Sequence, residues 1–144
     1  GGRVLPQDSP QEASVVVCVP KVRLSTETAY RDLSKALDLP RPAASLGPNP
    51  TQNWDRLNAL QHNDFELTAF KKHEVLASLR SDLERAGATV ARMTGSGSAL
   101  FGIFERPKEA ELAKAALVER DEVDIVLMAK TLTTGPLNPV EPRR

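Results

Sequence analysis

Four short runs of apolar, β-prone residues constrain the fold of this chain more than any other feature. They cover Ser14 to Val19, Thr89 to Met93, Ala99 to Phe104 and Val123 to Ala129. Continuous apolar runs of this length, bounded by turn-forming residues, are typical of buried strands. Each run is far shorter than a membrane span, so we expect a soluble, cytoplasmic protein without a membrane partner.

The intervals between these runs carry the residue spacing of amphipathic helices. Ser25 or Thr26 can cap the first helix, and Pro107 suits the start of the last one. The expected helices cover about 26–37, a short stretch around Trp54, 63–86 with a break near 71–73, and 107–117. The order is therefore strand, helices, strand, strand, helix, strand, which is the split βαβ or ferredoxin-like arrangement.

We therefore predict an α+β fold in which a four-stranded antiparallel sheet carries helices on one face, with an extra helical insertion after the first helix. The predicted core contains Cys18, Val90, Leu100 or Phe101, and Val126. One domain is expected over 14–131, with a leading segment at 1–13 and a flexible tail at 132–144. The chain begins with glycine rather than methionine, so we expect a piece of a longer protein.

The composition argues against redox, metal and nucleic-acid chemistry. Cys18 is the only cysteine and lies inside an apolar run, which predicts a buried, inert thiol. His62 and His73 are the only histidines, and their spacing fits no metal motif, so no metal site is expected. The 19 basic and 19 acidic residues leave no net charge, which argues against a nucleic-acid partner.

A run of small residues, Thr94-Gly95-Ser96-Gly97-Ser98, separates the second and third strands. We call it the glycine–serine loop. Glycines permit positive φ, serine hydroxyls add donors, and successive backbone N–H groups can then surround an anion. No Gly-Lys-Ser/Thr follows and the next element is a strand, so this is not a Walker loop. The spacing alone leaves open both a phosphate contact and a plain flexible turn.

Two further patterns bear on the helices. Asn63 and Glu66 have the N-cap to N3 spacing of a capping box, with Asn in place of Ser, and predict a helix start. Lys71, Lys72 and Arg80 are expected on a solvated helix face.

Three separated segments carry a family resemblance: VVVCVPKVRLSTETAYRDL, HNDFELTAF and LERAGATVARMTGSGSALFGIF. Their order resembles the C-terminal half of the GHMP small-molecule kinases, and most closely the family of 4-diphosphocytidyl-2-C-methyl-D-erythritol kinases, over residues 1 to about 131. The resemblance implies transfer of the γ-phosphoryl group of ATP, with Mg²⁺, to a hydroxyl of a cytidine-diphosphate sugar alcohol in non-mevalonate isoprenoid biosynthesis. This chain would then be the substrate-binding half of that kinase.

The resemblance also implies roles for individual residues. Ser25, Thr26 and Tyr30 would face the cytidine end of the substrate, with Tyr30 as an aromatic platform for the base. The position of Tyr30 on the apolar stripe of its helix leaves core packing open as the alternative. The glycine–serine loop would close over the phosphate region. The sequence departs from the family pattern at Lys21 to Leu24, where the family has a glycine before the Ser-Thr pair.

The catalytic aspartate, the catalytic lysine and the ATP loop of the family belong to an N-terminal GHMP kinase domain without a counterpart here. No catalytic residue is therefore assigned, the lone chain is expected to be inactive, and ATP and Mg²⁺ would be held mainly by that domain. An exposed apolar patch is expected where it docks. The alternative is a free-standing, non-catalytic ferredoxin-like module for ligand binding or protein interaction.

Overall fold

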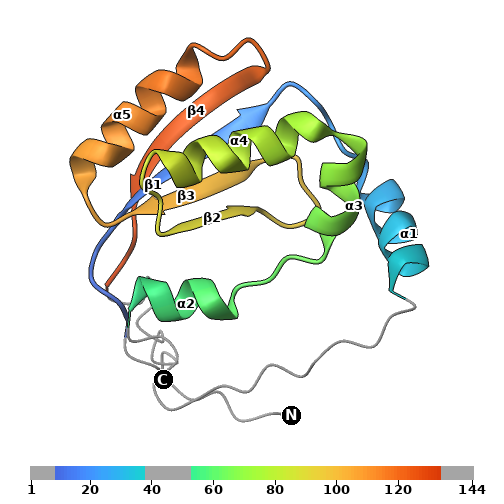
Figure 1. Cartoon of the computed structure of the whole chain (residues 1–144), viewed down its shortest axis with the longest axis horizontal. Coiled ribbons are helices and arrows are strands. Elements are labelled where there is room, and N and C mark those ends of the chain that lie inside the picture. Colours follow the sequence, from blue (N-terminus) through green and yellow to red (C-terminus); the bar gives the residue numbers. More distant parts are fainter. Residues whose placement is uncertain (1–8, 38–52, 134–144) are drawn as a thin grey trace, which may run out of the picture.

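The computed structural model describes residues 9–37 and 53–133. Most of the expected leading segment and tail, and residues 38–52, lie outside the described residues. The elements follow in the order β1 (Ser14–Pro20), α1 (Thr26–Ala36), α2 (Trp54–Leu60), α3 (Phe65–Lys72), α4 (Glu74–Arg85), β2 (Val90–Met93), β3 (Leu100–Phe104), α5 (Pro107–Val118) and β4 (Val123–Lys130) (Figure 1). Each predicted strand is present with its bounds correct to within one residue, and the expected helix break falls at His73.

The four strands form one antiparallel sheet in the order β2-β3-β1-β4. Central strand β1 pairs with β3 on one side and β4 on the other, so that Val17 lies opposite both Phe101 and Leu127. Cys18 likewise lies opposite Leu100 on β3 and Val126 on β4. This is the predicted ferredoxin-like arrangement, and β2 and β4 are its two edge strands.

Helices α4 and α5 pack against the front face of the sheet (Figure 1), and side chains at the centre of this face are completely buried. Side chains alternate between the faces of a strand, so Val16 and Cys18 of β1 point together toward the helices and are fully buried. Helical spacing places the fully buried leucines of α4 on one stripe, and the buried residues of α5 on another. These residues are Leu76, Leu79 and Leu83 of α4, and Ala110, Ala113 and Leu117 of α5.

The predicted core is confirmed. Cys18, Val90 and Leu100 are fully buried, whereas Phe101 and Val126 are half-buried against the core clusters. Val90 and Phe101 belong to a second cluster on the back face, away from α4 and α5.

The β2–β3 half of this back face is covered by α2, which belongs to the helical insertion and lies below β2 in Figure 1. Trp54 and Leu57 stand on one side of α2 and pack with Val90 and Ile103. The indole Nε1–H of Trp54 also donates to the Gln11 carbonyl at 3.0 Å. The expectation of helices on one face therefore holds for α4 and α5 but not for α2, because the apolar pair on α2 matches the apolar alternation of β2 and β3 on the other face.

The β1–β4 half of the back face stays uncovered by described residues. Two cross-strand pairs meet there, Val19 with Ile125 and Val17 with Leu127. Ile125 is 47% exposed and Leu127 is 56% exposed. We call these four residues the open β1–β4 patch. Such a patch was expected from the sequence.

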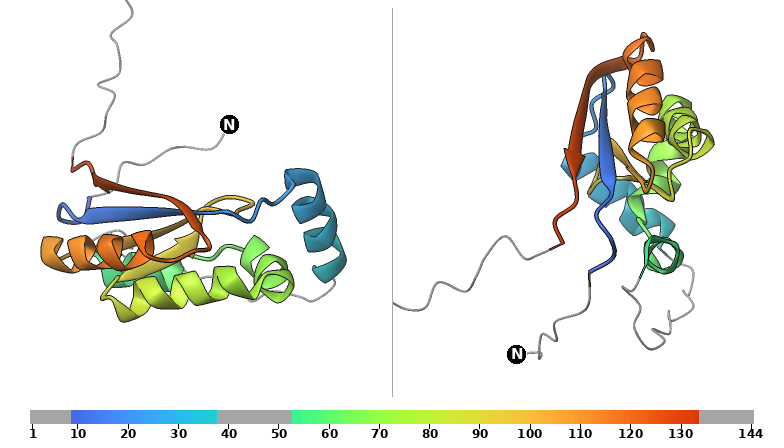
Figure 2. Two further views of the ribbon diagram at one scale, coloured as in Figure 1. Left: turned by 90° about the horizontal axis from the view of Figure 1, so that it is seen from above. Right: turned by 90° about the vertical axis from the view of Figure 1, so that its left-hand side faces the viewer.

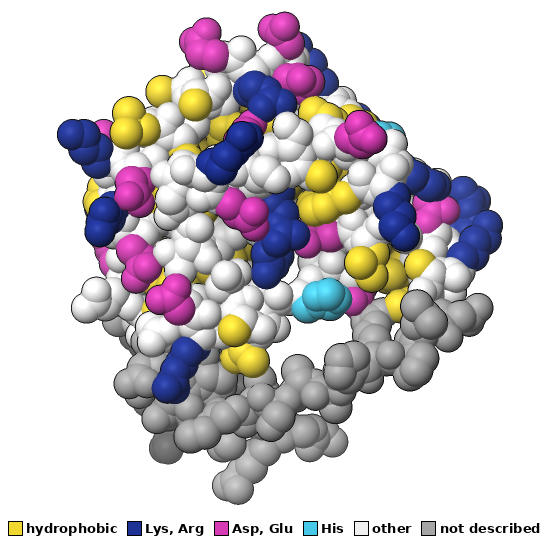
Figure 3. Space-filling model, viewed as in Figure 1, with side chains coloured by type: hydrophobic (Ala, Val, Ile, Leu, Met, Phe, Trp, Pro, Cys, Tyr) yellow, Lys and Arg dark blue, Asp and Glu magenta, His cyan; other side chains and the backbone are white. Residues whose placement is uncertain are grey.

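Helix α1 stands beyond the loop end of the sheet (Figure 2, left). It packs against α3, and an ion pair joins Asp32 of α1 to Lys72 of α3. Over the face covered by α4 and α5, acidic and basic side chains are interspersed (Figure 3). None of the helices within residues 9–37 and 53–133 is both long enough and apolar enough to span a bilayer.

Candidate functional site

The glycine–serine loop closes through two backbone hydrogen bonds. The Thr94 N–H donates to the Ala99 carbonyl at 2.9 Å, and the Gly97 N–H donates to the Thr94 carbonyl at 3.1 Å. In contrast, the N–H groups of Gly95 and Ser96 donate to no other residue in the described part of the chain. Donors of this kind, next to one another in a turn, are suited to holding an anion.

The two glycines of the loop have positive φ, +55° at Gly95 and +91° at Gly97, but their surroundings differ. A Cβ atom at Gly97 would lie 2.7 Å from a methyl carbon of Leu24 and 2.7 Å from the sulfur of Met93. A Cβ atom at Gly95 would meet nothing within 4 Å. Gly97 therefore faces the interior and Gly95 faces open space.

The N-terminus of α1 meets the glycine–serine loop. Ser25 is the N-cap of α1, and its Oγ accepts a hydrogen bond from the Thr28 N–H at 3.3 Å. The hydroxyl of Thr26 lies 3.3 Å from the hydroxyl of Ser96, within hydrogen-bond distance. Two predicted substrate-binding residues thus lie beside the predicted phosphate loop, although 70 residues separate Thr26 from Ser96 in the chain.

The bulky segment Lys21 to Leu24 fits this arrangement. Val22 and Leu24 pack against the core, whereas Lys21 is exposed and Arg23 forms an ion pair with Asp124 at 2.7 Å. Leu24 thereby supports the loop from the position that faces Gly97.

Tyr30 is 60% exposed, so the core-packing alternative for this residue is wrong. Its ring meets the ring of Phe65 edge-to-face, with centroids 4.9 Å apart and an interplanar angle of 81°. Phe65 is the first residue of α3 and also borders the groove beside the loop. Tyr30 is therefore held at the loop end of the molecule by one aromatic contact while much of its surface stays accessible.

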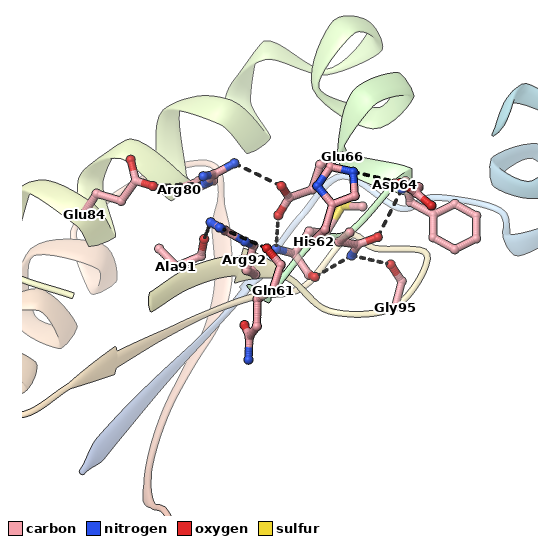
Figure 4. A network of polar contacts seen from close by, with 12 residues as sticks. Gln61, His62, Asp64, Glu66, Arg80, Glu84, Ala91, Arg92 and Gly95 are labelled. Atoms are coloured by element: carbon pink, nitrogen blue, oxygen red, sulfur yellow. Dashed lines mark hydrogen bonds and ion pairs between the residues drawn. The ribbon is translucent and has the colours of Figure 1, made fainter. Parts of the chain in front are cut away.

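The predicted helix start is present, because α3 begins at Phe65, but the reciprocal bonds of a capping box do not form: the Asn63 amide nitrogen and the Glu66 carboxylate bind the end of β2 and the glycine–serine loop. Glu66 and its partners are drawn in Figure 4. The Asn63 amide Nδ2 donates to the Met93 carbonyl at 2.6 Å and to the Gly95 carbonyl at 2.9 Å. Its Oδ1 accepts from the Phe65 N–H at 3.1 Å. Glu66 does not reach back to the helix start; its Oε1 accepts from the Met93 N–H at 2.8 Å.

The expectation that Arg80 lies on a solvated face is also wrong. Its Nη1 binds Glu66 Oε2 at 3.0 Å and its Nε binds Glu84 Oε1 at 3.1 Å, and the side chain is mostly buried (Figure 4). The buried Glu66 carboxylate needs a charge partner, and Arg80 supplies it from the next helix. Lys71 and Lys72 are exposed as expected, and Lys72 also forms an ion pair with Asp32.

A groove of about 490 Å³ runs beside the loop, between the end of α2 and strands β2 and β3. Arg92 and Phe101 contribute to its wall, together with Gly95. The Arg92 guanidinium donates to the Ala91 carbonyl at 2.8 Å and to the Gln61 carbonyl at 3.3 Å. Arg92 was not singled out from the sequence, although an arginine in an otherwise apolar strand is a signal for a polar site.

Two expectations about reactivity concern Cys18 and metals. Burial raises the pKa of the Cys18 thiol to about 11, which keeps it protonated near neutral pH. Among residues 9–37 and 53–133, no group of three or more His, Cys, Asp and Glu side chains could hold a metal ion.

The ion pair between α1 and α3 also changes a pKa. The hydrogen bond from Lys72 lowers the pKa of Asp32 below its usual value.

Comparison with protein families places the chain among known sequences. The family model for the C-terminal domain of GHMP kinases matches residues 43–122. A 4-diphosphocytidyl-2-C-methyl-D-erythritol kinase of Solibacter usitatus is 43% identical over 108 residues, which are 67% of this chain and 32% of that protein. The enzyme of the same name from Porphyromonas gingivalis is 34% identical over 116 residues, 80% of this chain and 40% of that protein.

Solved structures give the same result. A crystal structure of 4-(cytidine 5'-diphospho)-2C-methyl-D-erythritol kinase matches 85% of this chain and 44% of its own, with a TM-score of 0.61 and 25% identity. A homoserine kinase from Cytophaga hutchinsonii shares the fold at 14% identity, with a TM-score of 0.63, over 90% of this chain and 44% of its own. The chain spans about a third to two fifths of the length of the curated relatives it matches.

Proposed function

The chain belongs to the family of GHMP kinase C-terminal domains, and from this premise we propose that it is the substrate-binding half of an ATP-dependent kinase. The proposed reaction moves the γ-phosphoryl group of ATP to a hydroxyl of 4-diphosphocytidyl-2-C-methyl-D-erythritol, in the cytoplasm. Support for this substrate comes from the names of the relatives and from the residues around the glycine–serine loop.

The observation that carries the proposal is the contact between α1 and the glycine–serine loop. The Thr26 and Ser96 hydroxyls meet there, and Tyr30 lies one helical turn further along α1. In the proposed complex, the exposed face of Tyr30 stacks on the cytosine ring, and Ser25 and Thr26 line the path toward the diphosphate. An exposed aromatic ring beside N–H and hydroxyl donors suits a ligand that joins a base to phosphates.

In the proposed enzyme, the loop from Thr94 to Ser98 contacts phosphate oxygens through the N–H groups of Gly95 and Ser96. Phosphoryl transfer depends mainly on positioning and on stabilisation of negative charge, so such donors suit the reaction. The general base, the Mg²⁺ ligands and most of the ATP contacts are assigned to an N-terminal GHMP kinase domain. The open β1–β4 patch is the proposed contact surface for that domain.

The role of Tyr30 can be tested in the complete kinase, formed by this chain and a matching N-terminal domain. Stacking on a base contributes about 1–3 kcal/mol, so Tyr30→Ala should raise KM for the cytidine substrate about tenfold or more. Tyr30→Phe keeps the ring and should leave KM within about threefold of the wild type. Equal KM values for Tyr30→Ala and wild type would contradict the proposed base platform.

The alternative of a non-catalytic module has its own test. If the chain is such a module, native mass spectrometry should show a folded homodimer. This homodimer should bind neither ATP nor the cytidine substrate, even after a matching N-terminal domain is added. The proposed function instead predicts a complex of the two domains that binds the substrate.

A further inference from the structure

We propose that Asn63 and Glu66 are positioning residues that hold the glycine–serine loop in its phosphate-binding shape, an inference that rests on the proposed function. Asn63 lies two residues before α3 and Glu66 lies in its first turn, and both bind the backbone of Met93 at the end of strand β2. Neither touches the reacting groups in this scheme; they act through the backbone of Met93 and Gly95.

We call the hydrogen bonds from Asn63 and Glu66 to this backbone the clamp. The position of β2 at the edge of the sheet explains why they can form. Strand β2 is an edge strand, so at Met93 the backbone N–H and C=O that face away from β3 have no neighbouring strand to pair with. Glu66 accepts from that N–H at 2.8 Å, and Asn63 donates to that carbonyl at 2.6 Å. Two side chains thus take the place of the missing strand at the last residue before the loop.

Asn63 extends the clamp into the loop itself. The same amide nitrogen that binds Met93 also donates to the Gly95 carbonyl at 2.9 Å. Holding the Gly95 carbonyl orients the peptide group that joins Gly95 to Ser96, because the carbonyl and the following N–H belong to one rigid plane. The Ser96 N–H is one of the two donors that the proposed function assigns to phosphate.

Glu66 is in turn fixed by Arg80, whose guanidinium also binds Glu84. Glu66 is only 9% exposed, and both oxygens of its carboxylate have a partner. Oε2 accepts from Arg80 and Oε1 accepts from the Met93 N–H. A buried carboxylate with both oxygens engaged has little freedom to rotate. The clamp is therefore connected to α4, which is packed on the fully buried face of the sheet.

The decisive variant is Asn63→Asp, which keeps the Oδ1 acceptor for the Phe65 N–H but replaces the amide donors with an oxygen facing two carbonyls. Its matched control is Asn53→Asp, the same change at the cap of α2, where Oδ1 accepts from Arg56 and the side chain does not touch the loop. In amide exchange of this chain, Asn63→Asp should accelerate exchange about tenfold or more at Thr94 and Gly97, whose N–H groups form the hydrogen bonds that close the loop, and Asn53→Asp should leave it unchanged.

Kinetics of the complete kinase test the positioning role. A small misplacement of a catalytic loop can lower turnover by as much as about a hundredfold, so Asn63→Asp should reduce kcat at least about tenfold. KM for the cytidine substrate, which is assigned to Tyr30, should change less than about threefold. For Glu66, Glu66→Gln retains an oxygen for the Met93 N–H but loses the ion pair with Arg80, so it should lower kcat less than Glu66→Ala, which removes both partners.

The outcomes separate the clamp from the proposed function. Unchanged loop exchange in folded Asn63→Asp would overturn the clamp whatever the activity. Faster exchange with unchanged kcat would overturn the positioning role. A wild-type complete protein without kinase turnover would overturn the proposed function and the catalytic part of this inference, and the exchange comparison would still decide the clamp.

Discussion

The two faces of the sheet differ in how completely they are covered. On the front face, Val16 and Leu100 are fully buried beneath Leu79 and the other leucines of α4. On the back face, α2 covers only the β2–β3 half, and Ile125 and Leu127 stay largely exposed. The front face therefore provides most of the buried core of the domain, whereas the open β1–β4 patch leaves apolar side chains exposed, and the proposed partner would bind there.

The largest effect should come from the front face. Leu79→Ala removes a fully buried side chain and leaves a cavity, so the free energy of unfolding should fall by about 2–5 kcal/mol. The same change on the back face, Leu127→Ala, should alter it by less than about 0.5 kcal/mol. Urea denaturation of both variants measures the difference. Similar losses would show that the open β1–β4 patch is covered in the lone chain.

A second contrast lies within the loop. Gly97→Asn places a side chain against Leu24 and Met93 at φ +91°, and should reduce the free energy of unfolding by about 2 kcal/mol or more. Gly95→Asn points into open space at φ +55°, where Asn is tolerated, and should lower it by less than about 1 kcal/mol. Thermal unfolding of the two variants compares them. A reversed order would contradict the inward orientation of Gly97.

A third prediction concerns the open β1–β4 patch. Leu127→Asp should leave the fold of the lone chain intact, because Leu127 is 56% exposed. A charge in the centre of an apolar contact is costly, so its affinity for a matching N-terminal domain should fall about tenfold or more. Isothermal titration calorimetry measures the affinity. As a control on an exposed helix position, Leu112→Asp should leave it unchanged, and equal losses for the two variants would argue against this contact surface.

The smallest effect is a pH dependence at the junction of α1 and α3. The folded-state pKa of Asp32 lies below the ordinary value of 3.8, chiefly because Lys72 donates a hydrogen bond to it. The folded state then binds fewer protons than the unfolded state, so the stabilisation is complete above the ordinary pKa and is lost as the pH falls through the lower folded-state pKa. Asp32→Asn should therefore match the wild type near pH 2 and be less stable near pH 6. Identical pH profiles in denaturation experiments would contradict this.

Strand positions and the fold class could be predicted from the sequence because apolar alternation and helical spacing are local properties. The polar partners could not. The spacing of Asn63 and Glu66 is the same for a capping box as for a clamp on β2, and only the approach of α3 to the sheet edge decides between them. Glu66 carries one signal, since helical spacing places it on the same side of α3 as the buried Ala69. The partners of Arg80 depend on the turn at His73, which sets α4 against α3.

The residues of the candidate site could be named from sequence motifs, but their contacts could not, because the contacts join distant parts of the chain. Thr26 and Ser96 were assigned to it through family motifs, and their contact joins segments far apart in the chain. The back-face position of α2 follows from Trp54 and Leu57 meeting Val90, which no local pattern specifies.

The most direct test of the account is an ATP-consumption assay with 4-diphosphocytidyl-2-C-methyl-D-erythritol as phosphoryl acceptor, with this chain alone and with this chain plus a matching N-terminal GHMP kinase domain. A loop of backbone donors can orient phosphate but cannot supply a general base or most of the nucleotide site. We expect no turnover above background for the chain alone and substrate-dependent turnover for the pair. Robust turnover by the chain alone, or none by a pair that forms a stable complex, would contradict this expectation.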